Sequence, residues 1–150
     1  MKPRELIEKW VETFNEGNAE KISEFDQDDA INHQVTHEPV VGKTAIREMF
    51  ENEFSQAEMT CLVENIFEDN DWGILEWKDP LGLRGCGFFQ IENGKIKFQR
   101  GYWDKLSFLR HHKLPIPTES NLLRWLLKIV KTNNHVIISD RPIEYLPSAM

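Results

Sequence analysis

The chain has 150 residues, with 18 Lys and Arg against 25 Asp and Glu, so its formal net charge is −7. This is the length of one domain, and a hydrophobic content of 40% is enough to build a core, which excludes intrinsic disorder for most of the chain. An acidic balance without a Lys/Arg cluster argues against nucleic acid as a partner, because binding a phosphate backbone requires several cations on one face.

The beginning of the chain carries no recognisable targeting segment. Its first ten residues, MKPRELIEKW, lack the apolar run of a secretion signal. No stretch of the sequence approaches the ~20 apolar residues that a membrane-spanning helix requires. The sequence therefore predicts a soluble, cytoplasmic protein.

Three helices are predicted in the first third of the chain. Gly17 ends the first one, on which apolar residues recur at helical spacing: Leu6, Ile7, Trp10, Val11 and Phe14. Asn18 can cap a second, shorter helix. After an extended stretch over residues 30–35, Gly42 opens a third helix, whose apolar face holds Ala45, Ile46, Met49, Phe50 and Phe54.

From residue 59 onward, short apolar strands alternate with turn residues. Strands are predicted over residues 59–68, 72–78, 84–91 and 95–104. The Asn93-Gly94 pair before the last strand is typical of a tight hairpin, because a type I′ turn needs two residues that tolerate a left-handed backbone. The middle of the chain is therefore predicted to be an antiparallel meander.

The end of the chain differs in pattern. We expect a domain over residues 1–117 and an extension over residues 118–150, since two prolines forbid a regular helix at the boundary. Within the extension, a wide apolar face predicts a helix to about residue 131, packed on the domain or on a partner subunit. A membrane surface is disfavoured as its partner, because only three cations line that helix.

Together, these elements predict an α+β fold in which a curved antiparallel sheet forms a cone and the N-terminal helices lie on its concave face. Four segments carry a resemblance in this order: residues 14–18 (FNEGN), 41–46 (VGKTAI), 93–96 (NGKI) and 100–104 (RGYWD). Their order and spacing, over residues 3–115, resemble the SnoaL-like branch of the nuclear transport factor 2-like superfamily.

The resemblance implies a hydrophobic pocket between helices and sheet. In the superfamily this pocket serves ketosteroid isomerases, polyketide cyclases, limonene epoxide hydrolases and binding modules, so the fold leaves the function open. No nucleophile motif, phosphate loop or cofactor fingerprint occurs in the sequence. We therefore expect a protein that binds a small apolar molecule and needs no cofactor, as an isomerase, cyclase or hydrolase. The alternative is a non-catalytic dimerisation or ligand-binding module.

A polar cluster at the end of the last strand is the first candidate for catalysis. Strand alternation places Arg100, Tyr102 and Asp104 on the same face as Ile96 and Phe98, facing the pocket. The alternative is a bulge at Gly101, which would move the residues after it to the other face. Asp104 would be the general base, with the Arg100 guanidinium or the Tyr102 hydroxyl stabilising an oxyanion. The resemblance adds that SnoaL-like cyclases use an Asp a few residues after a strand-end aromatic, whereas Asp104 follows Trp103 directly. The alternative is that Asp104 caps the turn that follows it.

Other polar residues have both a functional and a structural interpretation. His33 lies on the early extended stretch and could act as a general acid or base, or could be a hydrogen-bonded, partly buried His. Glu76 lies in an apolar strand and could line the pocket or form a surface ion pair. His33 and His37 have the spacing of metal ligands on a helix, but Pro39 and the strand-like surroundings break that geometry, so no metal is expected.

Aromatic residues are numerous enough to line a pocket for a flat apolar ligand. The candidates, which could equally be core residues, are Trp10, Phe14, Phe50, Trp77, Phe88 and Trp103. Superfamily members often form dimers through the outer face of the sheet, so the resemblance also implies a homodimer.

Overall fold

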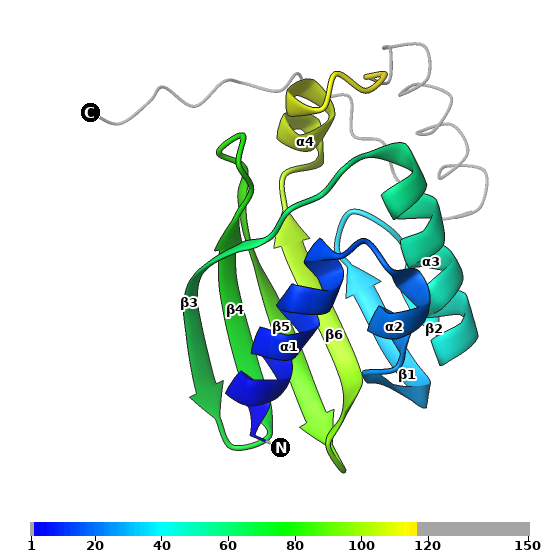
Figure 1. Ribbon diagram of the computed structural model, residues 1–150, viewed down its shortest axis with the longest axis vertical. Helices are drawn as coiled ribbons and strands as arrows, with labels where there is room; N and C mark the ends of the chain where they lie inside the picture. The colour runs from blue at the N-terminus through cyan, green and yellow to red at the C-terminus, as the bar shows by residue number, and fades with distance from the viewer. Residues whose placement is uncertain (1, 117–150) are drawn as a thin grey trace, which may run out of the picture. The chain divides into compact units, whose positions relative to one another are not determined.

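The computed structural model describes residues 2–116. The chain divides into two compact units, residues 1–114 and 115–150, and the extension helix predicted from residue 118 lies outside the described residues. Figure 1 shows the elements of the first unit. In chain order they are α1 (Pro3–Asn15), α2 (Ala19–Ser23), β1 (Asp26–Gln34), β2 (Val40–Val41), α3 (Lys43–Gln56), β3 (Leu62–Asp69), β4 (Trp72–Lys78), β5 (Arg84–Glu92), β6 (Lys95–Trp103) and α4 (Lys105–His111).

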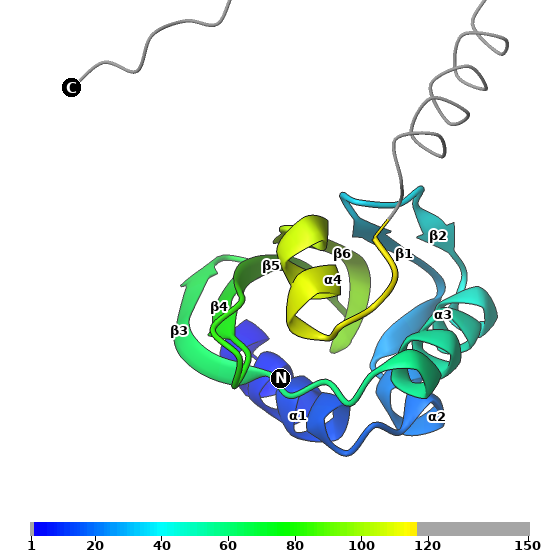
Figure 2. The same ribbon diagram turned by 90° about the horizontal axis from the view of Figure 1, so that it is seen from above.

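The three predicted N-terminal helices form and cover one face of the sheet, which confirms the α+β architecture (Figures 1 and 2). Helix α1 buries the apolar stripe that predicted it, and α3 buries Ile46 and Phe50. This burial stabilises the helices because short isolated helices are marginal in water. Among the described residues, no helix is long and apolar enough to cross a bilayer.

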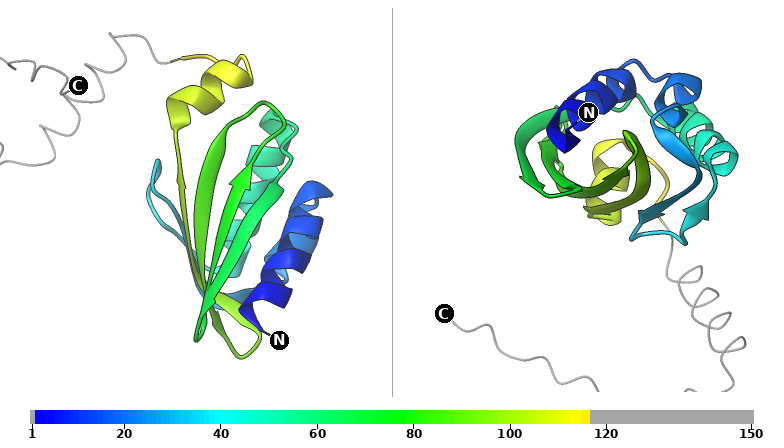
Figure 3. Two further views of the ribbon diagram at one scale, coloured as in Figure 1. Left: turned by 90° about the vertical axis from the view of Figure 1, so that its left-hand side faces the viewer. Right: turned by 90° about the horizontal axis from the view of Figure 1, so that it is seen from below.

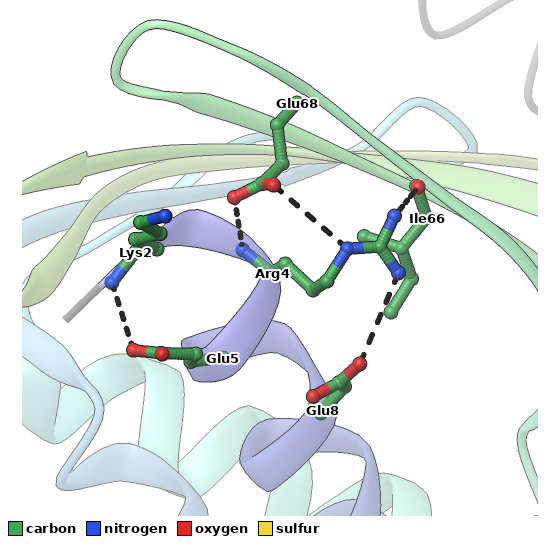
Figure 4. Close-up of polar contacts among 6 residues, drawn as sticks. All are labelled: Lys2, Arg4, Glu5, Glu8, Ile66 and Glu68. Carbon is green, nitrogen blue, oxygen red and sulfur yellow. Dashed lines mark hydrogen bonds and ion pairs between the residues drawn. The ribbon is translucent and has the colours of Figure 1, made fainter.

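Polar contacts fix helix α1 at both ends. At its start, Arg4 donates its backbone N–H to Glu68 (2.9 Å), and its guanidinium reaches the Ile66 carbonyl and lies 3.8 Å from the Glu68 carboxylate (Figure 4). At its end, the Asn15 amide donates to the Cys61 carbonyl (3.0 Å) and accepts from the Cys61 N–H (2.7 Å). These contacts align α1 along β3, so that its apolar face points into the sheet.

The sheet has the order β2-β1-β6-β5-β4-β3. Strands β3 to β6 form the predicted antiparallel meander, and Asn93 and Gly94 take positive φ angles of 53° and 74°, as a type I′ turn requires. Strand β1, however, runs parallel to β6. The sheet is therefore mixed, because β1, the first strand in the chain, pairs in parallel with β6, the last strand of the meander.

An irregularity in β6 decides which of its side chains face the helices. Gln90 pairs with Phe98 but Ile91 pairs with Ile96, so one residue of β6 is extra at this point. Such a bulge shifts the alternation of side chains by one. As a result Gln99 is 5% exposed on the concave side, whereas Tyr102 is 41% exposed on the convex side. The predicted face for Arg100 and Tyr102 is therefore wrong.

The strands diverge towards the end of the sheet where α4 lies (Figure 3). At the narrow end, side chains such as Ile22, Ile91 and Ile96 fill the space between sheet and helices. Higher up, Trp10 packs its ring on Phe14 and Phe89, with centroid distances of 5.2 Å to each. The core side chains therefore fill the narrow end of the cone. The wide end, next to α4, contains the cavity described below.

Candidate functional site

A cavity of about 740 Å³ occupies the wide end of the cone. It is large enough for a drug-sized molecule. Its wall comes from α1, β1, β2, α3, β4, β5, β6 and α4 and from the loops that join them. Seen from above, α4 lies over the ring that the sheet and the N-terminal helices form (Figure 2). The wall includes five of the aromatic residues predicted to line a pocket, namely Trp10, Phe14, Phe50, Trp77 and Trp103. Phe88 is not in the wall, because it packs edge-to-face against Tyr102 on the convex side, with centroids 5.8 Å apart.

Glu53 is the carboxyl group of the wall whose protonation is most perturbed. It lies on α3, one helical turn after Phe50, and is half-buried in the cavity. Burial raises the pKa of Glu53 from 4.5 to about 7, because the apolar surroundings disfavour the charged form. Glu53 can therefore both accept and donate a proton near neutral pH.

A chain of hydrogen-bonded amides crosses the floor of the cavity from β6 to β1 and back. The Trp103 indole N–H donates to Gln34 Oε1 (3.0 Å), and Gln34 Nε2 donates to Asn32 Oδ1 (2.9 Å). Asn32 Nδ2 then donates to Gln99 Oε1 (3.1 Å). The parallel pairing of β1 with β6, which places Asn32 beside Gln99, brings these residues together.

A His–carboxylate pair lies at the mouth of the cavity. Asp79 Oδ1 accepts hydrogen bonds from the backbone N–H groups of Leu81 (2.9 Å) and Leu83 (2.8 Å), which hold it in the β4–β5 turn. His112 Nε2 is 3.5 Å from Asp79 Oδ2. The His112 ring also packs on Phe108, at 4.4 Å between centroids. These contacts connect α4 to the rim of the cavity.

The structure places Asp104 outside the cavity wall. Its carboxylate caps α4, accepting hydrogen bonds from the backbone N–H groups of Leu106 (3.1 Å) and Ser107 (3.3 Å) and from the Ser107 hydroxyl. The hydrogen bond from the Ser107 hydroxyl lowers the pKa of Asp104 below its usual value. This geometry corresponds to the structural alternative, a carboxylate that caps the following turn.

The remaining predicted residues lie on the convex side of the sheet, away from Glu53. Arg100 lies over the Phe98 ring, 4.8 Å from its centroid, and His33 is its neighbour in the register of β1 and β6. Glu76 accepts a hydrogen bond from Asn65 (2.7 Å) on the adjacent strand. None of these three side chains lines the cavity. The bulge in β6 separates Arg100 from the pocket, as described above.

The sequence carried one signal for Glu53 that the prediction did not use. Ile46, Met49, Phe50 and Glu53 follow one another at helical spacing, so a carboxylate stands on an apolar stripe. In contrast, the pairing of His112 with Asp79 depends on residues 33 positions apart, and no local pattern indicates it. Within residues 2–116, no group of three or more His, Cys, Asp or Glu side chains could hold a metal ion.

The family model of the SnoaL-like domain matches residues 7–99, which is more than half of the chain. The chain belongs to the SnoaL-like domain family. This confirms the resemblance stated from the sequence motifs. The comparison with curated proteins found no match.

Solved structures share the fold of this SnoaL-like protein. SalBIII, an epoxide hydrolase/cyclase-like enzyme in pyran ring formation of the polyether salinomycin, has 21% identity and a TM-score of 0.61, over 69% of this chain and 92% of its own. A hypothetical protein with a ketosteroid isomerase-like fold from Catenulispora acidiphila, in complex with trimethylamine, has 13% identity and a TM-score of 0.68, over 77% of this chain and 96% of its own. An NTF2-like protein of unknown function from Cytophaga hutchinsonii has 16% identity and a TM-score of 0.59, over 73% and 96%.

Proposed function

We propose that this SnoaL-like protein binds a small apolar molecule in the cavity and catalyses a cofactor-independent proton transfer, as an isomerase, cyclase or hydrolase does. The observation that carries the proposal is Glu53, a half-buried carboxyl group in an aromatic cavity, whose pKa burial raises to about 7. A base with a pKa near the working pH combines a large ionised fraction with good basicity.

The proton transfer needs only groups that the chain supplies. The Glu53 carboxylate takes a proton from a carbon next to a carbonyl, the C–H electron pair forms the C=C bond of an enolate, and the negative charge moves to the oxygen. The Glu53 acid then returns the proton to carbon. No electron leaves the substrate, so the reaction requires no redox partner. The same carboxylate can instead remove a proton from water or a hydroxyl that attacks an electrophilic carbon.

Glu53 takes the role that the sequence suggested for Asp104. Desolvation raises the pKa of Glu53, whereas Asp104 is exposed and its carboxylate oxygens accept the hydrogen bonds that cap α4. The similarity to SalBIII, an epoxide hydrolase/cyclase-like enzyme, supports the reaction class. The predicted cytoplasmic location and homodimer stay predictions.

Deuterium exchange tests the proton abstraction directly. We choose 1-indanone, a flat ketone with two exchangeable protons at C2, and follow their loss in D2O by NMR. The wild-type protein should accelerate exchange, and the rate should rise with pH and level off above about 7, because the carboxylate is the active form. Glu53→Gln should lower the protein-catalysed rate at least about 100-fold, the lower end of what general-base catalysis contributes.

Asp104→Asn serves as the matched control, since it makes the same chemical change in a carboxylate outside the cavity and Asn is an equally good cap. It should keep the wild-type exchange rate. Equal rates for wild type and Glu53→Gln would contradict the role of Glu53. Exchange no faster than in buffer, with 1-indanone bound, would contradict the proton transfer itself.

A further inference from the structure

The direction of the amide chain in the cavity floor is fixed at one end. An indole N–H is a donor only, so the side chain that meets Trp103 must present an acceptor. Gln34 does so with Oε1, at 3.0 Å from Trp103 Nε1. Its Nε2 group must then point the other way, towards Asn32.

The orientation of each amide determines the orientation of the next one. Because Gln34 donates to Asn32 Oδ1, the Asn32 amide turns its Nδ2 group towards Gln99, and Gln99 accepts with Oε1. Reversing any one amide would set two N–H groups or two oxygens against each other. The single indole therefore dictates the orientation of all three amides that follow it.

The amide chain ends on a donor, Gln99 Nε2, that has no partner within residues 2–116. Gln99 Nε2 makes no hydrogen bond with the described residues, and Gln99, which is 5% exposed, lines the cavity. On the sheet, Gln99 pairs with Phe89, whose side chain is 1% exposed in the apolar wall. Gln99 Nε2 is not among the side-chain atoms that are fully buried without a partner, so it is accessible from the cavity. A ligand that fills the cavity removes water from this N–H group, which then costs free energy unless the ligand supplies an acceptor oxygen.

The close approach of β1 and β6 at Gly101 keeps the Gln34 side chain in the position that the amide chain requires. Gly101 lies against the Gln34 side chain, and a Cβ atom at residue 101 would overlap the Gln34 amide. Gly101 therefore leaves the room in which Gln34 can accept from Trp103. The amide chain is consequently a built feature of the cavity, supported by both of the strands that it joins.

We propose that Gln99 determines substrate specificity by donating its amide N–H to an acceptor oxygen of the substrate. The substrate class is then a flat apolar molecule with a carbonyl or ether oxygen, and molecules that present only a donor at this position are disfavoured. This inference rests on the proposed function, because it assumes that the cavity holds the substrate. Trp103 and Gln34 are positioning residues, which act through Gln99.

Two probes of similar size, 1-indanone and indole, test whether the cavity prefers a hydrogen-bond acceptor to a donor. The oxygen of 1-indanone only accepts hydrogen bonds, whereas the N–H of indole only donates. Isothermal titration calorimetry gives the Kd of each. Wild-type protein should bind 1-indanone at least about fivefold more tightly than indole, the smallest penalty expected when a buried donor is left unpaired or meets another donor.

Trp103→Phe removes the indole that orients the amide chain. The three side-chain amides can then turn by 180° and present Gln99 Oε1 to the cavity. The preference for 1-indanone over indole should therefore fall to within about twofold. Trp77→Phe is the matched control, because Trp77 also lines the cavity but makes no hydrogen bond with the described residues. It should change both affinities by a similar factor and keep their ratio.

Gln99→Met, which replaces the amide by an apolar side chain of similar length, gives a second test. It should weaken 1-indanone at least about fivefold and leave indole unchanged or tighter. Equal affinities for both probes in the wild-type protein, or an unchanged ratio in Trp103→Phe, would overturn this inference while leaving the cavity and Glu53 intact. Binding of neither probe would overturn the inference and the ligand-binding cavity together, whereas equal deuterium exchange by wild type and Glu53→Gln would overturn only the proposed catalysis.

Discussion

Asp26 gives the protein a pH-dependent stability that the structure allows us to estimate. Its carboxyl group lies at the start of β1, is 3% exposed, and leaves Oδ2 without a hydrogen bond to any described residue. Burial raises the pKa of Asp26 from 3.8 to about 7, against the attraction of the Lys43 and Lys95 ammonium groups, which lowers it. The folded protein therefore keeps a proton on Asp26 that the unfolded chain releases.

The sign follows from proton linkage. Between pH 3.8 and about 7 the folded state binds more protons than the unfolded state, so the free energy of unfolding falls as pH rises. Asp26 contributes its full stability below pH 3.8, and this contribution is lost by about pH 7. A difference of about 3 pKa units corresponds to about 4 kcal/mol, a large part of a typical domain's stability.

Asp26→Asn tests this value because it preserves the shape of the side chain and removes its titration. Urea denaturation at pH 4 and pH 8 gives the free energy of unfolding of both proteins. Between pH 4 and pH 8, the free energy of unfolding of the wild type should fall by about 4 kcal/mol more than that of the variant. Glu53 also titrates in this range, but it is present in both proteins and cancels in the difference.

Asp28→Asn is the matched control, because it neutralises an exposed carboxyl group on the same strand. Its free energy of unfolding should follow the wild-type pH dependence. If the difference between wild type and Asp26→Asn stays constant within about 1 kcal/mol from pH 4 to pH 8, the assignment of a raised pKa to Asp26 is refuted.

Three further substitutions test the packing that positions the site. Phe89→Ala removes the ring on which Trp10 packs and should lower the free energy of unfolding in urea by about 3–5 kcal/mol; a loss below about 1 kcal/mol would show that this ring is not part of a tight core. Gly101→Ala should cost about 1–3 kcal/mol by crowding Gln34, and it should reduce the preference for 1-indanone over indole in calorimetry; an unchanged preference would separate the amide chain from ligand selection. Asp104→Ala should lower the melting temperature by removing the cap of α4 but leave Glu53-dependent deuterium exchange intact, and loss of exchange in a folded variant would return Asp104 to the catalytic site.

The sequence alone determined the elements whose signals are local. The apolar stripe from Leu6 to Phe14 specifies α1, because residues three and four apart share one helix face. Asn93 and Gly94 specify the β5–β6 turn, because few residues tolerate two successive left-handed conformations. Such signals, repeated in order, were enough for the α+β class and the SnoaL-like family.

Only the tertiary structure decided which polar residues share a cavity. One extra residue in β6 turned Gln99 inward and Arg100 outward, and the parallel pairing with β1 placed Asn32 beside Gln99. The raised pKa of Glu53 likewise depends on walls contributed by distant segments. Bulges, strand partners and desolvation all arise from contacts between residues far apart in the chain. A periodic pattern within one element contains no information about them.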